Sequence, residues 1–144
     1  MFIHFGPNTW MDKEGDDLSI PASGLNPSKL DTDQWVATAK SMAAKYIVFV
    51  AKHCGGFCWW QTETTDYSVA GTPWKNGKGD VMADLAASCK KAGMALGVYL
   101  SPRDDFSRIK GGGRADSPEE QAEYEHKFRR QLTELLTNYG DIEE

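Results

Sequence analysis

The sequence predicts an α/β fold built on a parallel sheet. Three short apolar runs, at residues 2–5, 46–51 and 94–100, alternate along the chain with three segments of helical periodicity. The second run is continuously β-branched and aromatic, which is typical of a strand buried on both faces. Strands and helices that alternate with right-handed crossovers give either an open doubly wound sheet or a (β/α)8 barrel.

The first run ends at Gly6 and Pro7, and a polar stretch that contains several Gly and Asp residues follows it to about Lys29. Gly and Pro interrupt regular structure, so this run predicts a short strand followed by a long loop.

Helical periodicity starts after this loop, where Asp31 or Thr32 can act as the N-cap. Apolar side chains then recur at spacings of i, i+4 and i+7, at Trp35, Ala39 and Met42. The pattern predicts a helix that continues to about residue 45.

The run at 46–51 predicts the second strand, and a long polar loop from Phe57 to Gly79 follows it. Asp80 can cap a second helix, which Gly93 ends in the C′ position. Its core-facing side chains are Val81, Leu85, Cys89 and Ala92. Residues 94–100 then predict the third strand.

The start of the last helix has the strongest local signal in the chain. Ser117 can act as the N-cap, Pro118 suits the first helical position, and Glu120 completes a capping box. The apolar face of this helix consists of Tyr124, Phe128, Leu132, Leu135 and Tyr139. We expect Gly140 to end it.

We expect the barrel rather than the doubly wound sheet. A doubly wound nucleotide fold usually carries a Gly-rich phosphate loop after its first strand, whereas here the loops are long and aromatic. A complete barrel needs roughly 250 residues, and this chain holds about three β/α units. Residues 1–144 therefore read as one partial, incomplete barrel domain whose sheet has an unpaired edge, and we expect the isolated chain to aggregate or remain loosely packed.

The composition excludes several classes of function. A net charge of −5, with Lys and Arg scattered along the chain, offers no basic surface for nucleic acid. We find no apolar run long enough to span a membrane, and no signal peptide is visible, which leaves the compartment open. The three cysteines have no disulfide or zinc-site spacing, so we expect no metal site. We expect no other cofactor either.

Polar side chains follow each predicted strand. His4, His53 with Cys54, and Tyr99 stand at or next to the three strand ends. Active sites of (β/α)8 barrels form at this end of the strands. Because imidazole and phenol groups each donate or accept hydrogen bonds, the set suits a polyhydroxylated ligand such as a sugar.

The sequence also resembles a known family over almost its whole length. The similar motifs are MFIHFGPNT (1–9), LDTDQWV (30–36), AKH (51–53), GFC (56–58), TTDYSV (64–69), PWKNGKGD (73–80) and GVYLSP (97–102). All of them resemble the bacterial family 29 α-L-fucosidases.

The resemblance implies a (β/α)8 barrel that hydrolyses terminal α-L-fucosides of fucosylated glycans with retention of configuration and without a metal. Such enzymes use an aspartate nucleophile and a separate carboxylic acid/base. By resemblance, both would lie after Glu144, so we expect residues 1–144 alone to be inactive. Family members are often secreted, periplasmic or lysosomal.

The resemblance further implies roles for individual residues. His4 and His53 would bind fucose hydroxyls, Tyr99 would line the pocket, and Glu14 would match a sugar-binding acid. Trp60 matches the family position better than its neighbour Trp59. Trp59, Trp60 and Trp74 therefore have two interpretations, as platforms for the aglycone or as anchors that pack the loop.

The chain departs from the family after His53. The family usually reads Lys-His-His-Asp-Gly-Phe where this sequence has KHCGGF, so Cys54 replaces a sugar-binding histidine and Gly55 replaces an acid. A thiol is a weak donor and cannot replace an imidazole hydrogen bond. This departure keeps open a non-catalytic carbohydrate-binding barrel, and a self-standing α/β small-molecule-binding domain is a weaker alternative.

Overall fold

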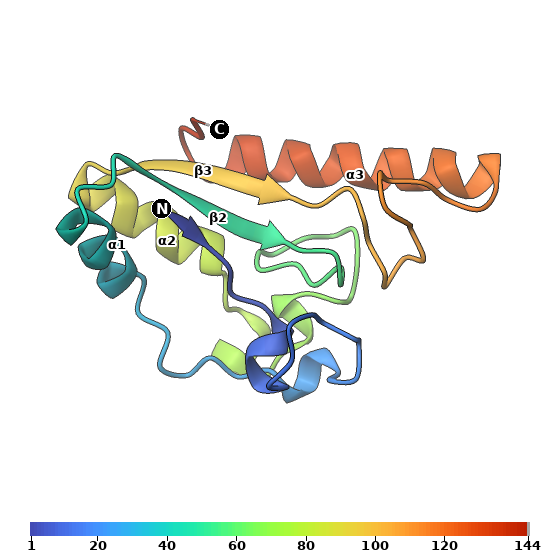
Figure 1. Cartoon of the computed structure of the whole chain (residues 1–144), viewed down its shortest axis with the longest axis horizontal. Helices are drawn as coiled ribbons and strands as arrows, with labels where there is room; N and C mark the ends of the chain where they lie inside the picture. Colours follow the sequence, from blue (N-terminus) through green and yellow to red (C-terminus); the bar gives the residue numbers. More distant parts are fainter. Residues whose placement is uncertain (144) are drawn as a thin grey trace.

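A computed structural model describes residues 1–143 and confirms the predicted parallel sheet (Figure 1). Its strands, in the spatial order β1-β2-β3, are β1 (Phe2–Ile3), β2 (Tyr46–Lys52) and β3 (Ala95–Leu100). The helices are α1 (Thr32–Ser41), α2 (Val81–Ala92) and α3 (Pro118–Asn138). Both strand pairs are parallel. The element order is therefore the predicted alternation, with strand and helix ends moved by a few residues.

Each α-helix begins at the predicted N-cap. The cap side chain accepts a backbone hydrogen bond three residues on in all three cases, at Asp31 (3.1 Å), Asp80 (2.8 Å) and Ser117 (3.2 Å). At the other end of α2, Gly93 adopts the left-handed conformation with φ 64°, as its predicted C′ position requires.

The end of α1 differs from the prediction. The helix stops at Ser41, and Met42, which we placed on its apolar face, is 62% exposed. Ala43 then takes a positive φ of 57°, which turns the chain toward β2. Ala39 is buried as predicted, and the other buried side chains of α1 are Thr32 and Val36.

The loop between β2 and α2 is a packed structure, which corrects our prediction of a polar loop. Trp59, Trp60 and Trp74 are all buried. Short bridges hold the loop against the sheet, because Cys58 pairs with both Lys52 and Ser68. The packing could not be predicted from the sequence, because the loop is rich in polar residues and its apolar residues follow neither helical nor strand periodicity.

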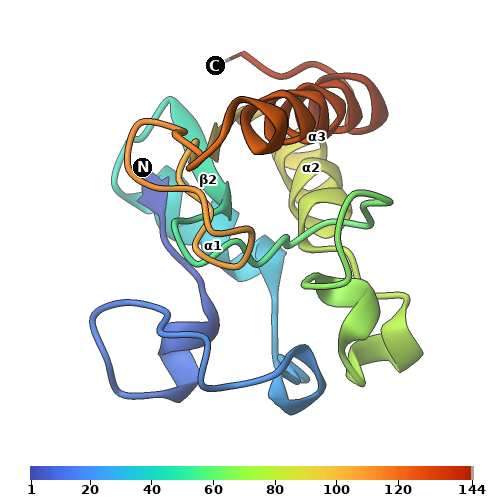
Figure 2. The same cartoon turned by 90° about the vertical axis from the view of Figure 1, so that its right-hand side faces the viewer.

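The two faces of the sheet have different surroundings. Ile3, Phe49 and Val98 stand in register and belong to the core that packs against the helices. Figure 2 shows α2 and α3 on the same side of the sheet. Side chains alternate along a strand, so Phe2 and Tyr99 lie on the opposite face, where Phe2 is 52% exposed.

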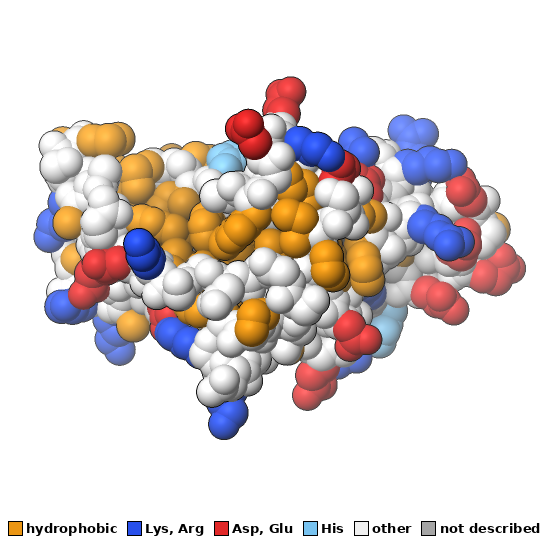
Figure 3. Space-filling view, turned by 90° about the horizontal axis from the view of Figure 1, so that it is seen from below, with side chains coloured by type: hydrophobic (Ala, Val, Ile, Leu, Met, Phe, Trp, Pro, Cys, Tyr) orange, Lys and Arg blue, Asp and Glu red, His pale blue; other side chains and the backbone are white. Residues whose placement is uncertain are grey.

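Hydrophobic side chains also gather along the β1 side of the molecule, where Figure 3 shows a continuous apolar band.

At the other edge of the sheet, the backbone N–H of Glu143 donates to the carbonyl oxygen of Leu96 in β3, at 2.9 Å. The segment after α3 therefore returns to the outer edge of β3.

Candidate functional site

The structure brings together the two histidines that follow β1 and β2. The ring centroids of His4 and His53 lie 5.6 Å apart with an edge-to-face orientation. The ring of Tyr99, at the end of β3, lies 6.2 Å from that of His53. Parallel strands end at one edge of a sheet, so three distant segments deliver these rings to one place.

A pocket of about 160 Å³ opens beside this pair of histidines. It is small compared with the roughly 300–1,000 Å³ of pockets that hold drug-sized ligands. His4 and His53 line it together with two acids from the loop after β1, Glu14 and Asp16. Phe5, Phe57 and Trp59 supply aromatic surface, and Gly55 and Gly56 contribute backbone.

The surroundings of His53 favour its neutral form. Burial lowers the pKa of its imidazole below the ordinary value of 6.5, and the nearby side chains of His4 and Arg103 lower it further. A neutral imidazole donates from one ring nitrogen and accepts at the other. His53 is therefore suited to hydrogen-bond a hydroxyl group, which also donates and accepts.

Local hydrogen bonds shape the loop that carries the two acids. The Nδ2 of Asn8 donates to the carbonyl oxygen of Glu14 at 3.2 Å. The Oδ1 of Asp16 accepts from the backbone N–H of Leu18 at 2.9 Å, and its Oδ2 accepts from the hydroxyl of Tyr67 at 3.0 Å. Asp16 is thus fixed at the pocket wall, a position that sequence reasoning did not find.

Two other predicted residues lie near the pocket without lining it. Tyr99 packs against Phe2, with ring centroids 6.0 Å apart, and stands behind His53. The thiol of Cys54 lies 4.0 Å from the hydroxyl of Ser101, which donates to it. The sulfur is therefore directed toward the β3 end instead of into the pocket.

Trp60 does not line this pocket. Its side chain is completely buried, and its Nε1 donates to the Oε2 of Glu134 in α3 at 2.8 Å. Trp59, the neighbour that we ranked lower, lines the pocket. The two neighbouring side chains therefore have different surroundings, with Trp59 at the pocket and Trp60 against α3. Trp60 acts as an anchor for α3.

Comparison with known proteins identifies the family of the chain. A family model described as α-L-fucosidase matches residues 4–143. The chain belongs to the α-L-fucosidase family. Alpha-L-fucosidase 1 of Arabidopsis thaliana is 44% identical over all 144 residues, and the chain spans 27% of that protein's length.

Solved structures of the same family share the fold. A glycoside hydrolase family 29 member from a rumen bacterium is 43% identical with a TM-score of 0.84, over 98% of this chain and 24% of that one. A Ruminococcus gnavus family 29 fucosidase in complex with fucose is 33% identical with a TM-score of 0.74, over 94% of this chain and 29% of that one.

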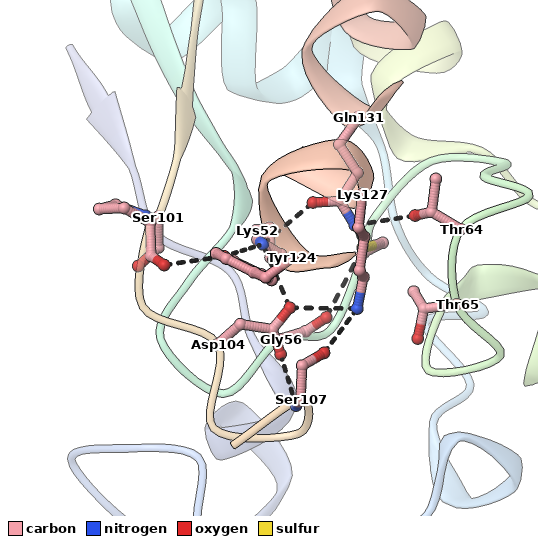
Figure 4. Close-up of polar contacts among 12 residues, drawn as sticks. Lys52, Gly56, Thr64, Thr65, Ser101, Asp104, Ser107, Tyr124, Lys127 and Gln131 are labelled. Carbon is pink, nitrogen blue, oxygen red and sulfur yellow. Dashed lines mark hydrogen bonds and ion pairs between the residues drawn. The ribbon is translucent and has the colours of Figure 1, made fainter. Parts of the chain in front are cut away.

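Behind the pocket, this fucosidase-family chain buries a charged network that the sequence did not reveal (Figure 4). Lys52, the last residue of β2, contacts Asp104 (3.3 Å), Tyr124 (3.2 Å) and Gln131 (3.0 Å) through its Nζ. Burial lowers the pKa of Lys52, while the carboxylate of Asp104 opposes that shift. Lys127 also contacts Asp104, at 3.3 Å.

The network fixes the backbone next to His53. The Oδ1 of Asp104 accepts from the backbone N–H of Ser107 at 2.9 Å and shapes the turn that follows β3. The backbone N–H of Asp105 then donates to the carbonyl oxygen of Cys54 at 2.8 Å. The ion pair thus ties the turn after β3 to the segment that carries the pocket residues.

Within residues 1–143, no helix has the length and apolarity to cross a bilayer. In the same part of the chain, no group of three His, Cys, Asp or Glu side chains is arranged to hold a metal ion. The positions after Glu144, where we expect the nucleophile and the acid/base, lie outside the described residues.

Proposed function

We propose that this chain is part of a retaining α-L-fucosidase that removes terminal α-L-fucose from fucosylated glycans. The observation that carries the proposal is the pairing of His4 with His53, at a centroid distance of 5.6 Å, in a pocket that Glu14 also lines. Family membership supports the substrate class, as does the fucose bound to the Ruminococcus gnavus relative.

We further propose that residues 1–144 form the first part of a (β/α)8 barrel and constitute one partial domain. Three features support it: the strands are parallel and neighbours in sequence order, the helices cover one face, and aromatic side chains occupy the other. The bond from Glu143 to Leu96 also suits a fourth strand that joins the sheet beside β3. In such a barrel, the exposed ring of Phe2 would lie in the interior.

Sugar recognition in this proposal uses hydrogen bonds between the sugar hydroxyls and the imidazole and carboxylate groups of the pocket. His4 and His53 would each bind a ring hydroxyl, and the carboxylate of Glu14 would accept from another. Hydrogen bonds that involve charged groups are the stronger ones, so Glu14 would contribute most to orientation. Tyr99 would support the His53 ring from behind, through the contact between their rings.

The chemical step would follow the two-carboxylate scheme of retaining glycosidases. One carboxylate attacks the anomeric carbon while the second group protonates the departing oxygen, and water then hydrolyses the glycosyl-enzyme with the second group as base. We place both carboxylates after Glu144. The role of residues 1–144 is then to bind and orient the sugar.

A second function is favoured by one observation. The Cys54 thiol faces Ser101, so it supplies no group in place of the imidazole that the family usually carries there. A pocket that has lost one sugar contact can still bind a glycan without turning it over. We therefore carry a non-catalytic carbohydrate-binding barrel as the alternative.

The test uses a hybrid barrel in which residues 1–144 replace the matching segment of the Arabidopsis relative. We expect the folded hybrid barrel to bind L-fucose in calorimetric titration. His4→Ala and His53→Ala should each weaken binding about 10-fold or more, because each removes one hydrogen bond to the sugar. His126→Ala, at an exposed position of α3, is the matched control. Equal affinity in all three variants would contradict the proposed site.

A further inference from the structure

The carboxylate of Asp16 occupies the space that a side chain on Gly55 would need. A Cβ atom built on Gly55 would lie 2.3 Å from the Oδ2 of Asp16 and 2.7 Å from its Cγ. Such distances are far inside van der Waals contact. Asp16 in its present position and any side chain at residue 55 therefore exclude each other.

Asp16 is held in this position from two sides. The backbone N–H of Leu18 donates to Oδ1 and the hydroxyl of Tyr67 donates to Oδ2, at 2.9 and 3.0 Å. Tyr67 is itself buried, and its ring stacks on Phe106 at 4.6 Å with an interplanar angle of 15°. The phenol is thus fixed by packing, and it fixes the carboxylate in turn.

The held carboxylate still has capacity for a ligand. An ionised carboxylate offers about four lone-pair positions, and the two contacts of Asp16 use two of them. The residue lines the same pocket as His4, Glu14 and His53. A preorganised acceptor at the wall of a small pocket suits a ligand that donates several hydrogen bonds.

We propose that Asp16 binds a ring hydroxyl of the sugar and supplies, from the loop after β1, the carboxylate that Gly55 lacks. The ligand is a neutral pyranose with several free hydroxyl groups, and the inference rests on the proposed function of the pocket. Asp16 then compensates for the absence of a side chain at residue 55. The carboxylate at the pocket wall then comes from the loop after β1 and not from the loop after β2.

The first experiment compares substitutions at two neighbouring acids in the hybrid barrel. Asp16→Asn keeps the volume of the side chain and Asp16→Ala removes it, while Asp17→Asn is the matched control. Asp17 lies in the same loop but pairs with Lys13 and does not line the pocket. We expect both Asp16 variants to bind L-fucose about 10- to 100-fold more weakly, and the control to bind normally.

The second experiment moves the carboxylate. Gly55→Asp alone should lower both the melting temperature and the affinity for L-fucose, because its Cβ collides with Asp16. The double variant Asp16→Gly with Gly55→Asp removes the collision and should restore binding to within a few-fold of the unsubstituted protein. If the folded double variant binds L-fucose no better than Asp16→Gly, a carboxylate at residue 55 cannot replace that of Asp16, and the proposal is wrong.

The outcomes separate this inference from the proposed function. If the unsubstituted hybrid barrel folds but does not bind L-fucose, both are wrong. If it binds L-fucose and Asp16→Asn, Asp16→Ala and Asp17→Asn all bind equally well, only the role of Asp16 is wrong. Melting temperatures of each variant show whether a lost affinity reflects the pocket or unfolding.

Discussion

Lys52 and Asp104 form a completely buried ion pair, with 3.3 Å between Nζ and Oδ2 and both side chains 0% exposed. Lys52 immediately precedes His53, and Asp104 organises the turn that is hydrogen-bonded to Cys54. Charges in such a position are tolerated only when partners replace their water. The pair therefore links the stability of this region to the geometry of the pocket.

We predict that Lys52→Met lowers the free energy of unfolding of the hybrid barrel by about 3 kcal/mol. The substitution leaves Asp104 buried with only Lys127 as a charged partner, and breaking a buried pair typically costs about 3–5 kcal/mol. Urea denaturation measures the change.

The control for this prediction is a double variant. Adding Asp104→Asn to Lys52→Met removes the uncompensated charge and should recover part of the loss. Lys91→Met, which breaks an exposed pair with Asp33, should leave stability nearly unchanged. If Lys52→Met were as harmless as Lys91→Met, the buried pair would have no structural role.

We predict that Asp80→Ala destabilises the hybrid barrel by about 2–3 kcal/mol. Asp80 caps α2 through the N–H of Ala83, and its Oδ2 accepts from the N–H of Gln61 (3.2 Å) and the hydroxyl of Tyr139 (2.9 Å). One carboxylate thus joins α2, the preceding loop and the end of α3. Thermal unfolding tests this, with Asp84→Ala as the matched control at a partly exposed position of α2. Equal losses in the two variants would argue against the prediction.

We predict that acid destabilises the folded state partly through His53. Its pKa is lowered in the folded state, so the unfolded chain binds more protons below the ordinary value of 6.5. Stability is therefore full above that value and falls as the pH drops through it, until His53 is also protonated in the folded state. The slope of stability between about pH 7 and pH 5 should become shallower in His53→Gln. An unchanged slope would show that His53 is not held neutral.

We predict that the three cysteines differ in reactivity. Burial raises the pKa of Cys58 to about 12 and that of Cys89 to about 11, so neither forms the nucleophilic thiolate readily. Cys54 is only partly buried. Iodoacetamide should modify Cys54 first in the native protein, with all three labelled in urea. Peptide mass spectrometry would contradict the prediction if native Cys58 reacted as fast as Cys54.

Local signals in the sequence predicted the frame of the fold. Asp31, Asp80 and Ser117 bond to groups only three residues away, so short motifs are enough to find each helix start. The histidines at the strand ends were also predictable, because parallel strands deliver their ends to one edge. The end of α1 was not, since no Gly or Pro marks it.

The remaining features depend on partners that are distant in sequence. Lys52 meets side chains of α3 more than seventy residues later, and no periodicity encodes that contact. Which of Trp59 and Trp60 lines the pocket depends on the direction in which each side chain points from the loop, and the composition of the loop does not reveal that direction. Asp16 lies next to Gly55 only in the folded chain, so its place in the pocket needed the structure.

Hydrolysis of a chromogenic α-L-fucoside by the hybrid barrel tests the central claim most directly. Our account predicts fucose release by the hybrid barrel, none by residues 1–144 alone, and a strong loss of activity in His4→Ala and His53→Ala. A folded hybrid barrel that binds L-fucose but releases none from the substrate would contradict the fucosidase and support the carbohydrate-binding barrel.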